Sequence, residues 1–163
     1  LITKPLQMPG ELEIVFTTPL YQMVCEELKC GAPKKIKVQP LDATHVAQML
    51  ELTKLTKPGP FTERTIEFGN YNGVFENNKL IAMAGERMKV NGYTEASAIC
   101  THPDYLGKGY GSHLLEQASQ KIIDSGNIPF LHVRSDNEGA IALYKKKGFY
   151  IRADIYFAIF RKR

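Results

Sequence analysis

The sequence predicts a mixed α/β fold built around one mixed β-sheet. Strand-type residues at 93–101 lead through a glycine-rich loop into an amphipathic helix, and a second strand and helix follow directly. A strand, a helix and another strand in this order form a parallel pair. Earlier in the chain, Asn77-Asn78 and Asn91-Gly92 separate strand-type segments, and such dipeptides are typical of hairpins between antiparallel strands. Parallel and antiparallel pairs in one chain indicate a mixed sheet.

The N-terminal part of the chain is predicted to hold short elements that precede the main domain. We expect a strand at 12–16 and one or two helical turns at 21–28, after which Gly31-Ala32-Pro33 interrupts the chain. We place the main domain at residues 35–163 and interpret residues 1–34 as an N-terminal segment, the end of a preceding module. The chain begins without a methionine, which fits a fragment or a processed chain.

The main domain is predicted to begin with a strand at 35–39, after which Asp42 caps a helix. This helix ends at Pro58-Gly59-Pro60, and its inward residues are Val46, Met49, Leu50 and Leu52. The later elements are expected in this order: a short helix at 61–67, strands at 71–75, 80–90 and 93–101, a helix that Gly126 ends, a strand at 129–134, a helix from Asn137 to Gly148, and strands at 149–153 and 155–160.

The glycine-rich loop is the most informative segment, because its glycines directly precede a helix. Gly107, Gly109 and Gly111 let the backbone approach an anion and direct successive N–H groups toward it. The helix N-terminus behind them adds unpaired donors and the positive end of a dipole. The P-loop pattern Gly-x-x-x-x-Gly-Lys-Ser/Thr is not present. The dinucleotide fingerprint Gly-x-Gly-x-x-Gly is not present either, because Ser112 takes the position of its last glycine. A plain turn between a strand and a helix is the alternative. The buried stripe of the helix is expected to be Gly111, Leu114, Leu115, Ala118 and Ile122.

Asn137 and Tyr144 are the candidate functional residues of the next predicted helix. They are seven residues, or two turns, apart and therefore share one face. Asn137 is a favoured N-cap residue, the lysines at 145–147 complement the negative end of the helix dipole, and Gly148 ends the helix. A plain cap and a core tyrosine are the alternative interpretations of the two residues.

Together the two segments resemble the GNAT superfamily of acetyl-CoA-dependent N-acyltransferases, and the resemblance covers residues 35–163. One family motif, Arg/Gln-x-x-Gly-x-Gly/Ala, corresponds to residues 106–111, and a second, Asn-x-x-Ala-x-x-x-Tyr-x-x-x-Gly-Phe, corresponds to residues 137–149. Leu106 replaces the usual Arg or Gln, which removes one polar contact, while Lys108 keeps a positive charge close to the loop. A further likeness to a branch related to glycine N-acyltransferases is carried by residues 56–61, 82–87 and 100–103.

The resemblance implies a GNAT fold, in which helices cover both faces of a mixed, mostly antiparallel sheet. One parallel strand pair of that fold splays apart, and the pantetheine arm of acetyl-CoA lies between its strands. By the same resemblance, backbone groups of Ile99, Cys100 and Thr101 follow this arm. The implied contacts of the pyrophosphate are the amides of Gly107, Lys108, Gly109, Tyr110, Gly111 and Ser112, and those across the cleft are Asn137, Ala140 and Tyr144.

Composition excludes several classes of protein. The 163 residues suffice for a single core, and no apolar run approaches the ~20 residues of a membrane span. Three cysteines without CxxC spacing indicate reduced thiols and a cytoplasmic location. The four histidines lack metal-ligand spacing, so we expect no metal. The net charge of +4 would attract the phosphates of CoA, and the lack of aromatic residues among the basic ones argues against nucleic acid.

Acyl transfer from a thioester requires an aligned amine, a polarised carbonyl and a proton for the departing thiolate. We expect a backbone N–H near Ile99 to polarise the carbonyl and Tyr144 to protonate the thiolate, since an unperturbed phenol stays protonated at neutral pH. Glu95 is our first candidate for the base that takes the amine proton, and Glu86 or a water chain is the alternative. Strand alternation predicts one shared face for Glu95, Ser97, Ile99 and Thr101.

The sequence therefore predicts an enzyme, an N-acyltransferase that moves an acetyl or other short acyl group from acyl-CoA to a primary amine by direct attack in a ternary complex. The expected acceptor is a small amine, an amino acid or a peptide N-terminus, and Arg64 or Arg87 would hold an acceptor carboxylate. An acyl-CoA-binding sensor or scaffold with little turnover is the alternative, and a nucleic-acid-binding module comes third. Whether the protein forms a homodimer is left open.

Overall fold

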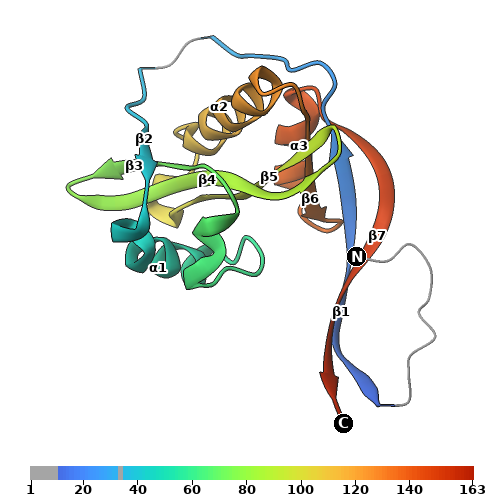
Figure 1. Ribbon diagram of the computed structural model, residues 1–163. Helices are drawn as coiled ribbons and strands as arrows, with labels where there is room; N and C mark the ends of the chain where they lie inside the picture. The colour runs from blue at the N-terminus through green and yellow to red at the C-terminus, as the bar shows by residue number, and fades with distance from the viewer. Residues whose placement is uncertain (1–10, 33–34) are drawn as a thin grey trace. The chain divides into compact units, whose positions relative to one another are not determined.

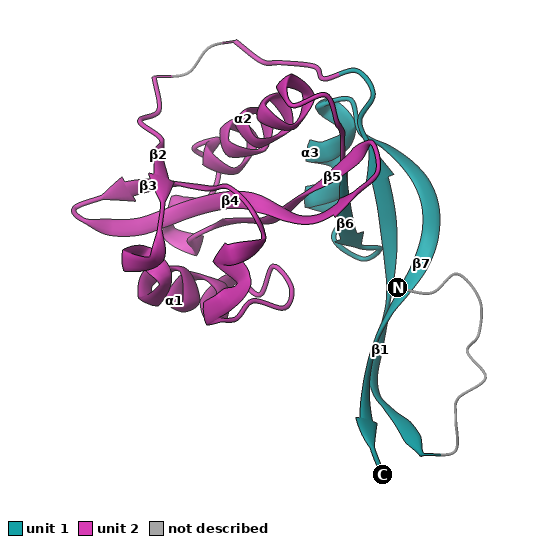
Figure 2. Ribbon diagram, viewed as in Figure 1, with its two compact units in different colours: residues 1–27, 130–163 teal, residues 28–129 magenta. Residues whose placement is uncertain are grey.

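The computed structural model describes residues 11–32 and 35–163 (Figure 1). Its described part is mixed α/β, with seven strands and three α-helices, which confirms the predicted fold class. The chain forms two compact units (Figure 2): residues 1–27 with 130–163, and residues 28–129. Most of the predicted main domain is described, whereas residues 1–10, Pro33 and Lys34 lie outside the described residues.

The unit of residues 28–129 contains an antiparallel sheet in the order β2-β3-β4-β5. These strands are β2 (Gln39–Leu41), β3 (Tyr71–Glu76), β4 (Lys79–Val90) and β5 (Tyr93–Thr101). Both predicted hairpins are confirmed. Asn77 and Asn78 adopt φ angles of 49° and 62°, and Gly92 adopts 77°, the left-handed conformations that tight hairpin turns require.

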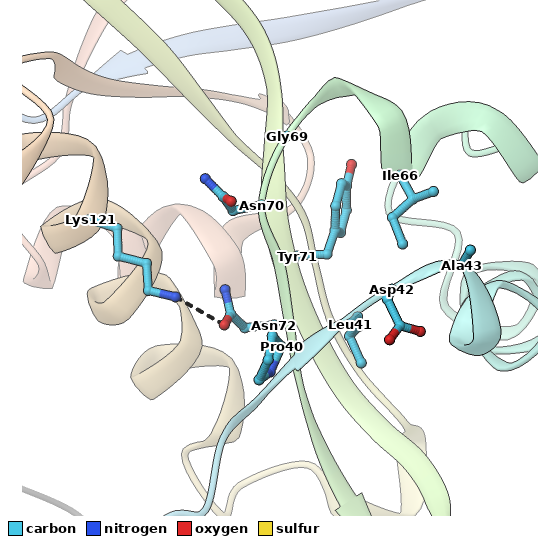
Figure 3. Close-up of a pocket in the computed structure, with 10 residues that line it drawn as sticks. All are labelled: Pro40, Leu41, Asp42, Ala43, Ile66, Gly69, Asn70, Tyr71, Asn72 and Lys121. Carbon is cyan, nitrogen blue, oxygen red and sulfur yellow. Dashed lines mark hydrogen bonds between the residues drawn. The ribbon is translucent and has the colours of Figure 1, made fainter.

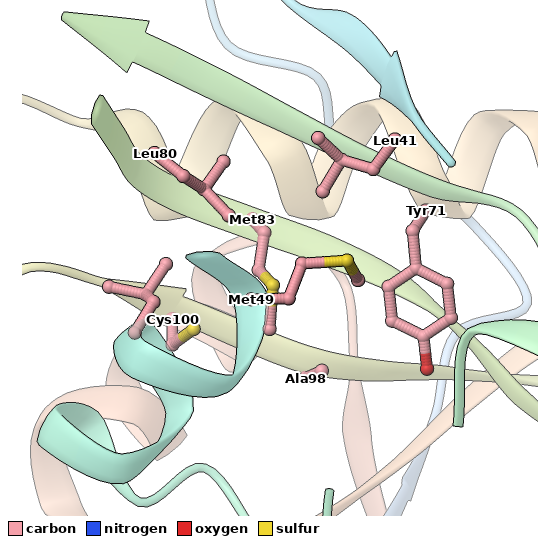
Figure 4. Close-up of a cluster of buried hydrophobic side chains, with 8 residues drawn as sticks. Leu41, Met49, Tyr71, Leu80, Met83, Ala98 and Cys100 are labelled. Atoms are coloured by element: carbon pink, nitrogen blue, oxygen red, sulfur yellow. The ribbon is translucent and has the colours of Figure 1, made fainter. Parts of the chain in front are cut away.

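Two helices cover opposite faces of this sheet (Figure 1). The helix α1 (Val46–Thr56) follows a short 3₁₀ turn, η1 (Ala43–His45), which Asp42 caps as predicted. Its buried side chains join a cluster with residues of β2 to β5 (Figure 4), which we call the α1 cluster: Leu41, Met49, Leu52, Tyr71, Leu80, Met83, Ala98 and Cys100. On the other face, α2 (Tyr110–Asp124) contributes to the α2 cluster: Val74, Ile81, Ala82, Ala84, Leu114 and Ala118.

Most of the predicted inward residues of these helices are buried. Met49 and Leu52 of α1 are buried, whereas Val46 and Leu50 are half-buried. In α2, the predicted stripe is buried except for the half-buried Gly111. Gly126, with a φ of 81°, follows the helix end as predicted. No helix in the described part of the chain is long and apolar enough to cross a membrane.

Two predictions for this unit are corrected. The strand predicted at 35–39 is wrong, because only Gln39–Leu41 pairs with β3. Ile36 and Val38 gave the segment its strand-like pattern, but they pack against the α2 cluster without joining a strand ladder. The short helix predicted at 61–67 is a 3₁₀ helix, η2 (Glu63–Phe68), which a capping box between Thr62 and Thr65 begins.

The other unit contains the strands β6, β1 and β7, which pair antiparallel in that order. Their bounds are Leu12–Val24 for β1, Ile128–Arg134 for β6 and Tyr150–Lys162 for β7, and the helix α3 spans Glu138–Lys146. Residues 1–34, interpreted as a separate segment, thus contribute β1 to this unit. The parallel pair predicted from the sequence has β5 in one unit and most of β6 in the other, and it stays a prediction.

Two further predictions are wrong in this unit, because strands continue through residues where the sequence predicts a helix or a gap between two strands. The helical turns predicted at 21–28 are wrong, since β1 continues through Val24 and its residues 20–24 pair with β6 on one side and with β7 on the other. The predicted strands at 149–153 and 155–160 are one strand, β7, in which Asp154 pairs with Tyr21. Asp154 lies between the two predicted strands, and although aspartate is rare in strands, its pairing with Tyr21 of β1 keeps it in the ladder.

Candidate active site

The glycine loop has the backbone geometry of an anion-binding turn. Gly107 and Gly109 adopt φ angles of 77° and 84°, in the left-handed region that glycine reaches without strain. Gly109 is the N-cap of α2, no side chain caps this helix, and its first turn contains no acidic residue. The N–H groups of Tyr110, Gly111 and Ser112, in the first turn of this helix, therefore have no intrahelical acceptor. This end of α2 can receive negative charge.

The side chains around the loop leave its backbone open. A Cβ added to Gly107 would have no heavy atom within 4 Å, and one added to Gly111 would lie 3.4 Å from the Thr101 hydroxyl oxygen. Lys108 places its Nζ 4.7 Å from the centre of the Tyr105 ring, so its charge stays beside the loop. Leu106, which replaces the polar residue of the family motif, is 65% exposed.

The strand that leads into the loop contains a β-bulge. Met83 pairs with Cys100 and Gly85 pairs with Ser97, so two residues of β5, Ala98 and Ile99, lie opposite one residue of β4. Ala98 has a φ of 51°, which is rare for a residue with a side chain. A bulge releases backbone groups from the ladder. The bulge lies where the sequence predicts that a backbone N–H polarises a carbonyl.

The bulge overturns the prediction that Glu95, Ser97, Ile99 and Thr101 share one face. Ser97 lies opposite Gly85, and a Cβ on Gly85 would meet the Tyr71 ring of the α1 cluster. Glu95 and Ser97 therefore face α1. Ile99 packs instead against the α2 cluster, and the Thr101 hydroxyl lies close to Gly111 of α2. The extra residue in the bulge reverses the side-chain alternation after position 97, so Cys100 points into the α1 cluster.

Glu95 forms an ion pair with Arg87 on the α1 face. The Arg87 Nε and Nη2 donate hydrogen bonds to Oε2 and Oε1 of Glu95, at 2.9 and 2.8 Å. The Glu95 side chain is only 2% exposed and that of Arg87 is 25% exposed. The hydrogen bonds to Glu95 raise the pKa of Arg87, more than burial lowers it. This two-point pairing fixes both side chains.

The alternative base, Glu86, is also buried and paired. Asn70 donates a hydrogen bond to its Oε1 at 3.1 Å, and the Lys89 Nζ lies 2.9 Å from its Oε2. Burial alone would raise the pKa of Glu86, but the hydrogen bonds from Asn70 and Lys89 outweigh it and lower the pKa. Both candidate bases are thus buried and held in ion pairs.

The arginines predicted to hold an acceptor carboxylate are each paired with a glutamate of the chain. Arg64 binds Glu67 through Nε and Nη2 on the exposed surface of η2. Arg87 uses the same two nitrogens for Glu95, which leaves its Nη1 without a bond to the described residues. An acceptor would meet a guanidinium whose charge is already balanced.

The second family motif lies in the other unit. Asn137 caps α3 as predicted, because its side-chain oxygen accepts a hydrogen bond from the Ala140 N–H at 3.2 Å. Asn137 is exposed, Ala140 is half-buried and Tyr144 is buried. The Tyr144 ring packs against Phe149 at 6.1 Å between ring centres. The Gly148 φ of 95° ends the helix as predicted.

Two features of the region were not predicted from the sequence. One is the hydroxyl of Tyr71, which is buried without a hydrogen-bond partner among the described residues. The other is a pocket at the end of the short strand β2 (Figure 3), where Lys121 donates a hydrogen bond to the Asn72 side chain at 3.0 Å. Nothing local in the sequence marks either feature, since each depends on residues that are distant in the chain. Among the described residues, no three His, Cys, Asp or Glu side chains gather as metal ligands would.

Comparisons with known proteins connect this geometry to a family. A family model described as FR47-like protein matches residues 71–158. The [Ribosomal protein bS18]-alanine N-acetyltransferase of Salmonella typhimurium is 30% identical over 117 residues, which cover 67% of this chain and 77% of the relative. The N-alpha-acetyltransferase RimI of Mycobacterium tuberculosis is 39% identical over 57 residues, 34% of each chain.

A similar solved structure extends the likeness over almost the whole chain. It is a putative acetyltransferase of the GNAT family from Novosphingobium aromaticivorans, with a TM-score of 0.90 and 30% sequence identity. The alignment covers 98% of this chain and 71% of that protein. The predicted likeness to a glycine N-acyltransferase branch is not among these findings and stays a prediction.

Proposed function

Because this chain belongs to the FR47-like family of GNAT N-acetyltransferases, we propose that it transfers an acetyl group from acetyl-CoA to a primary amine by direct attack in a ternary complex. The observation that carries this proposal is the uncapped N-terminus of α2 behind Gly107 and Gly109. It follows directly on β5, whose bulge at Ala98 frees backbone groups. An anion site and a free backbone donor on one continuous segment suit a thioester attached to a diphosphate.

The residues of the loop fit the phosphates of acetyl-CoA. We propose that the amides of residues 107–112 hold the pyrophosphate, supported by the left-handed glycines and the dipole of the 15-residue helix α2. Lys108 adds positive charge beside the loop. The backbone of Ile99, Cys100 and Thr101 would follow the pantetheine arm. Asn137, Ala140 and Tyr144 are proposed as the further contacts of acetyl-CoA, as the resemblance implies.

The proposed reaction needs no covalent enzyme intermediate. The amine nitrogen attacks the thioester carbonyl carbon, the C–N bond forms and the C–S bond breaks. A backbone N–H of the bulge stabilises the negative charge that develops on the carbonyl oxygen. The Tyr144 hydroxyl gives its proton to the departing thiolate, and Glu95 takes the proton that the amine loses. Since the Glu95 side chain is buried and paired with Arg87, we propose that this proton reaches Glu95 through an intervening water. Glu86 is the alternative base.

The relatives suggest the kind of acceptor. The Salmonella typhimurium relative is named for acetylating an alanine of a ribosomal protein, and the Mycobacterium tuberculosis relative is named for N-alpha acetylation. We propose an acceptor with a primary amine, of which a peptide N-terminus, an amino acid and a small amine are the classes to compare. A non-catalytic acyl-CoA sensor is less consistent with these names.

The direct test is acetyl-CoA-dependent release of free thiol in the presence of a panel of primary amines. We expect release above the uncatalysed rate with at least one class of amine, together with its N-acetylated product by mass spectrometry. If CoA stabilises the protein against heat while no amine gives release, the sensor is the correct function. If CoA does not stabilise it either, the proposed cofactor is wrong.

A further inference from the structure

The Tyr71 hydroxyl is a buried polar group on the α1 face that the proposed mechanism does not use. Tyr71 is 2% exposed, and its hydroxyl has no hydrogen-bond partner among the described residues. A buried hydroxyl that loses its bonds to water without gaining others costs about 1–3 kcal/mol. Buried polar groups of this kind are uncommon in native proteins and call for an explanation.

The position of the ring directs this hydroxyl toward β5 (Figure 4). Tyr71 pairs with Gly85 of β4, and a Cβ on Gly85 would come within 2.3 Å of the ring. The ring therefore lies flat across Gly85, where any side chain would displace it. Ser97 of β5 lies on the far side of Gly85, one residue before the bulge at Ala98. The hydroxyl is thus close to the segment where we propose that the thioester carbonyl is polarised.

The chemistry of this hydroxyl is that of a neutral donor. Burial raises the pKa of Tyr71 to about 12, so the phenol keeps its proton throughout the working pH range of an enzyme. A protonated phenol donates one hydrogen bond, and its best partner is an oxygen with a free lone pair. The hydroxyl can therefore recognise a carbonyl or carboxylate oxygen of a bound molecule.

The surrounding charges favour a neutral partner. Of the charged groups that act on Tyr71, Glu95 is balanced by Arg87, and Glu86 is balanced by Lys89. A carboxylate placed among these groups would bring an unbalanced negative charge into a desolvated region, which is costly. A peptide or amide carbonyl brings only a dipole, and its oxygen would satisfy the Tyr71 hydroxyl.

We propose that the Tyr71 hydroxyl donates a hydrogen bond to a carbonyl oxygen of the acceptor, so that the enzyme prefers an amine followed by a peptide or amide group over a free amino acid. This inference rests on the proposed function and names its substrate class. Phe61 packs edge-on against the Tyr71 ring, at 5.8 Å between ring centres. Phe61 is itself half-buried, and we propose that it moves aside when the acceptor carbonyl reaches the hydroxyl.

The test compares Tyr71→Phe with wild type on three amines: alaninamide, alanine and isopropylamine. For each amine, the ratio of variant to wild-type kcat/KM cancels the different basicity of the amines. We expect Tyr71→Phe to lower kcat/KM for alaninamide about three- to tenfold, as the loss of one neutral hydrogen bond would. For isopropylamine, which has no carbonyl, the value should not change. Wild type should also favour alaninamide over alanine.

Two controls separate recognition from a structural role. Tyr71→Phe should keep or raise the melting temperature, because it removes a buried hydroxyl that has no partner among the described residues. Tyr156→Phe, which removes an exposed hydroxyl of β7, should change no kinetic value. An equal loss with all three amines, no loss with alaninamide, or a lower melting temperature of Tyr71→Phe would overturn the proposal.

A binding measurement keeps the inference testable if no amine is acetylated. Calorimetric titration with N-acetylalaninamide, a mimic of the product, is carried out in the presence of CoA. Weaker binding to Tyr71→Phe than to wild type would support the hydrogen bond even though the proposed function had failed. Equal binding, or no binding to wild type, would overturn it. The melting-temperature shift with CoA, measured in parallel, tests the proposed function alone.

Discussion

At the scale of single residues, Tyr144 is the group on which the proposed mechanism depends most. Tyr144→Phe should keep the fold, because the ring still packs against Phe149. We expect kcat to fall ~10²-fold, the low end for the loss of a general acid, while CoA affinity by calorimetry changes little. Tyr150→Phe is the matched control, since Tyr150 is exposed and its hydroxyl bonds to Glu26. An unchanged kcat, with chemistry rate-limiting, would make Tyr144 a core residue only.

Glu95 is the second residue whose role can be tested directly. If it removes the ammonium proton, Glu95→Gln should lower turnover most at low pH, where little free amine is present. The loss should shrink as the pH approaches the pKa of the acceptor amine, because the amine then arrives deprotonated. A pH–rate profile parallel to that of wild type would exclude Glu95 as the base. Glu86→Gln, measured in the same series, then tests the alternative.

The ion pair of Glu95 shows what sequence could not provide at this scale. Strand alternation correctly placed Glu95 and Ser97 on one face of the sheet, but it did not indicate that Arg87 would bind both carboxylate oxygens of Glu95. That contact depends on the pairing of β4 with β5 and on the register shift between Glu86 and Lys89. Register is set by the whole hairpin and its bulges, and no short motif records it.

At the scale of secondary-structure elements, the glycine loop and α2 form the proposed phosphate site. Gly109→Asp should abolish the rise in melting temperature that CoA causes, because it adds a side chain and a negative charge at the N-terminus of α2. Gly92→Asp is the matched control. Gly92 has a similar φ of 77°, so both variants carry the same kind of backbone strain and the same charge, but Gly92 lies in the β4–β5 turn.

We expect Gly92→Asp to lower the melting temperature of the free protein while the shift with CoA remains. If Gly109→Asp keeps the shift as well, the loop is not the phosphate site. If both variants lose it, the effect of Gly109→Asp is one of backbone strain and not of charge at the site. Thermal unfolding followed at several CoA concentrations distinguishes these outcomes.

The elements that were predicted well are those with local causes. The turns at Asn77-Asn78 and Gly92, and the helix ends at Gly126 and Gly148, follow from the backbone conformations that these residues favour. The strand predicted at 12–16 lies within β1. Its continuation through Val24 was not predicted, because residues 20–24 owe their conformation to partners in β6 and β7, more than 100 residues away in the chain. The bulge at Ala98 was missed because alanine does not favour a positive φ.

At the scale of the whole molecule, the two family motifs belong to different compact units. The glycine loop lies in the unit of residues 28–129, and Asn137 and Tyr144 lie in the unit that contains β1, β6 and β7. The sequence revealed both motifs and their order, because each is a short local pattern. It could not reveal that β1 belongs to the unit of the second motif, since the pairing of β1 with β6 and β7 is entirely non-local.

The stability of the whole molecule should depend on pH through Glu86. In the folded protein its pKa lies below the ordinary value of 4.5, because the bonds from Asn70 and Lys89 outweigh burial. The unfolded chain therefore binds the proton first as the pH falls. The contribution of Glu86 to stability is fully present above pH 4.5 and is lost as the pH falls through the lowered value. Glu86→Gln should accordingly be less stable than wild type at pH 7, and the difference in stability between the two proteins should narrow in acid.

Melting temperatures measured from pH 7 down to about pH 3 test this expectation. Glu67→Gln is the control, since Glu67 is exposed and its pairing with Arg64 is screened by solvent. If the curves of Glu86→Gln and wild type remain parallel into acid, the buried pair of Glu86 does not couple protonation to folding.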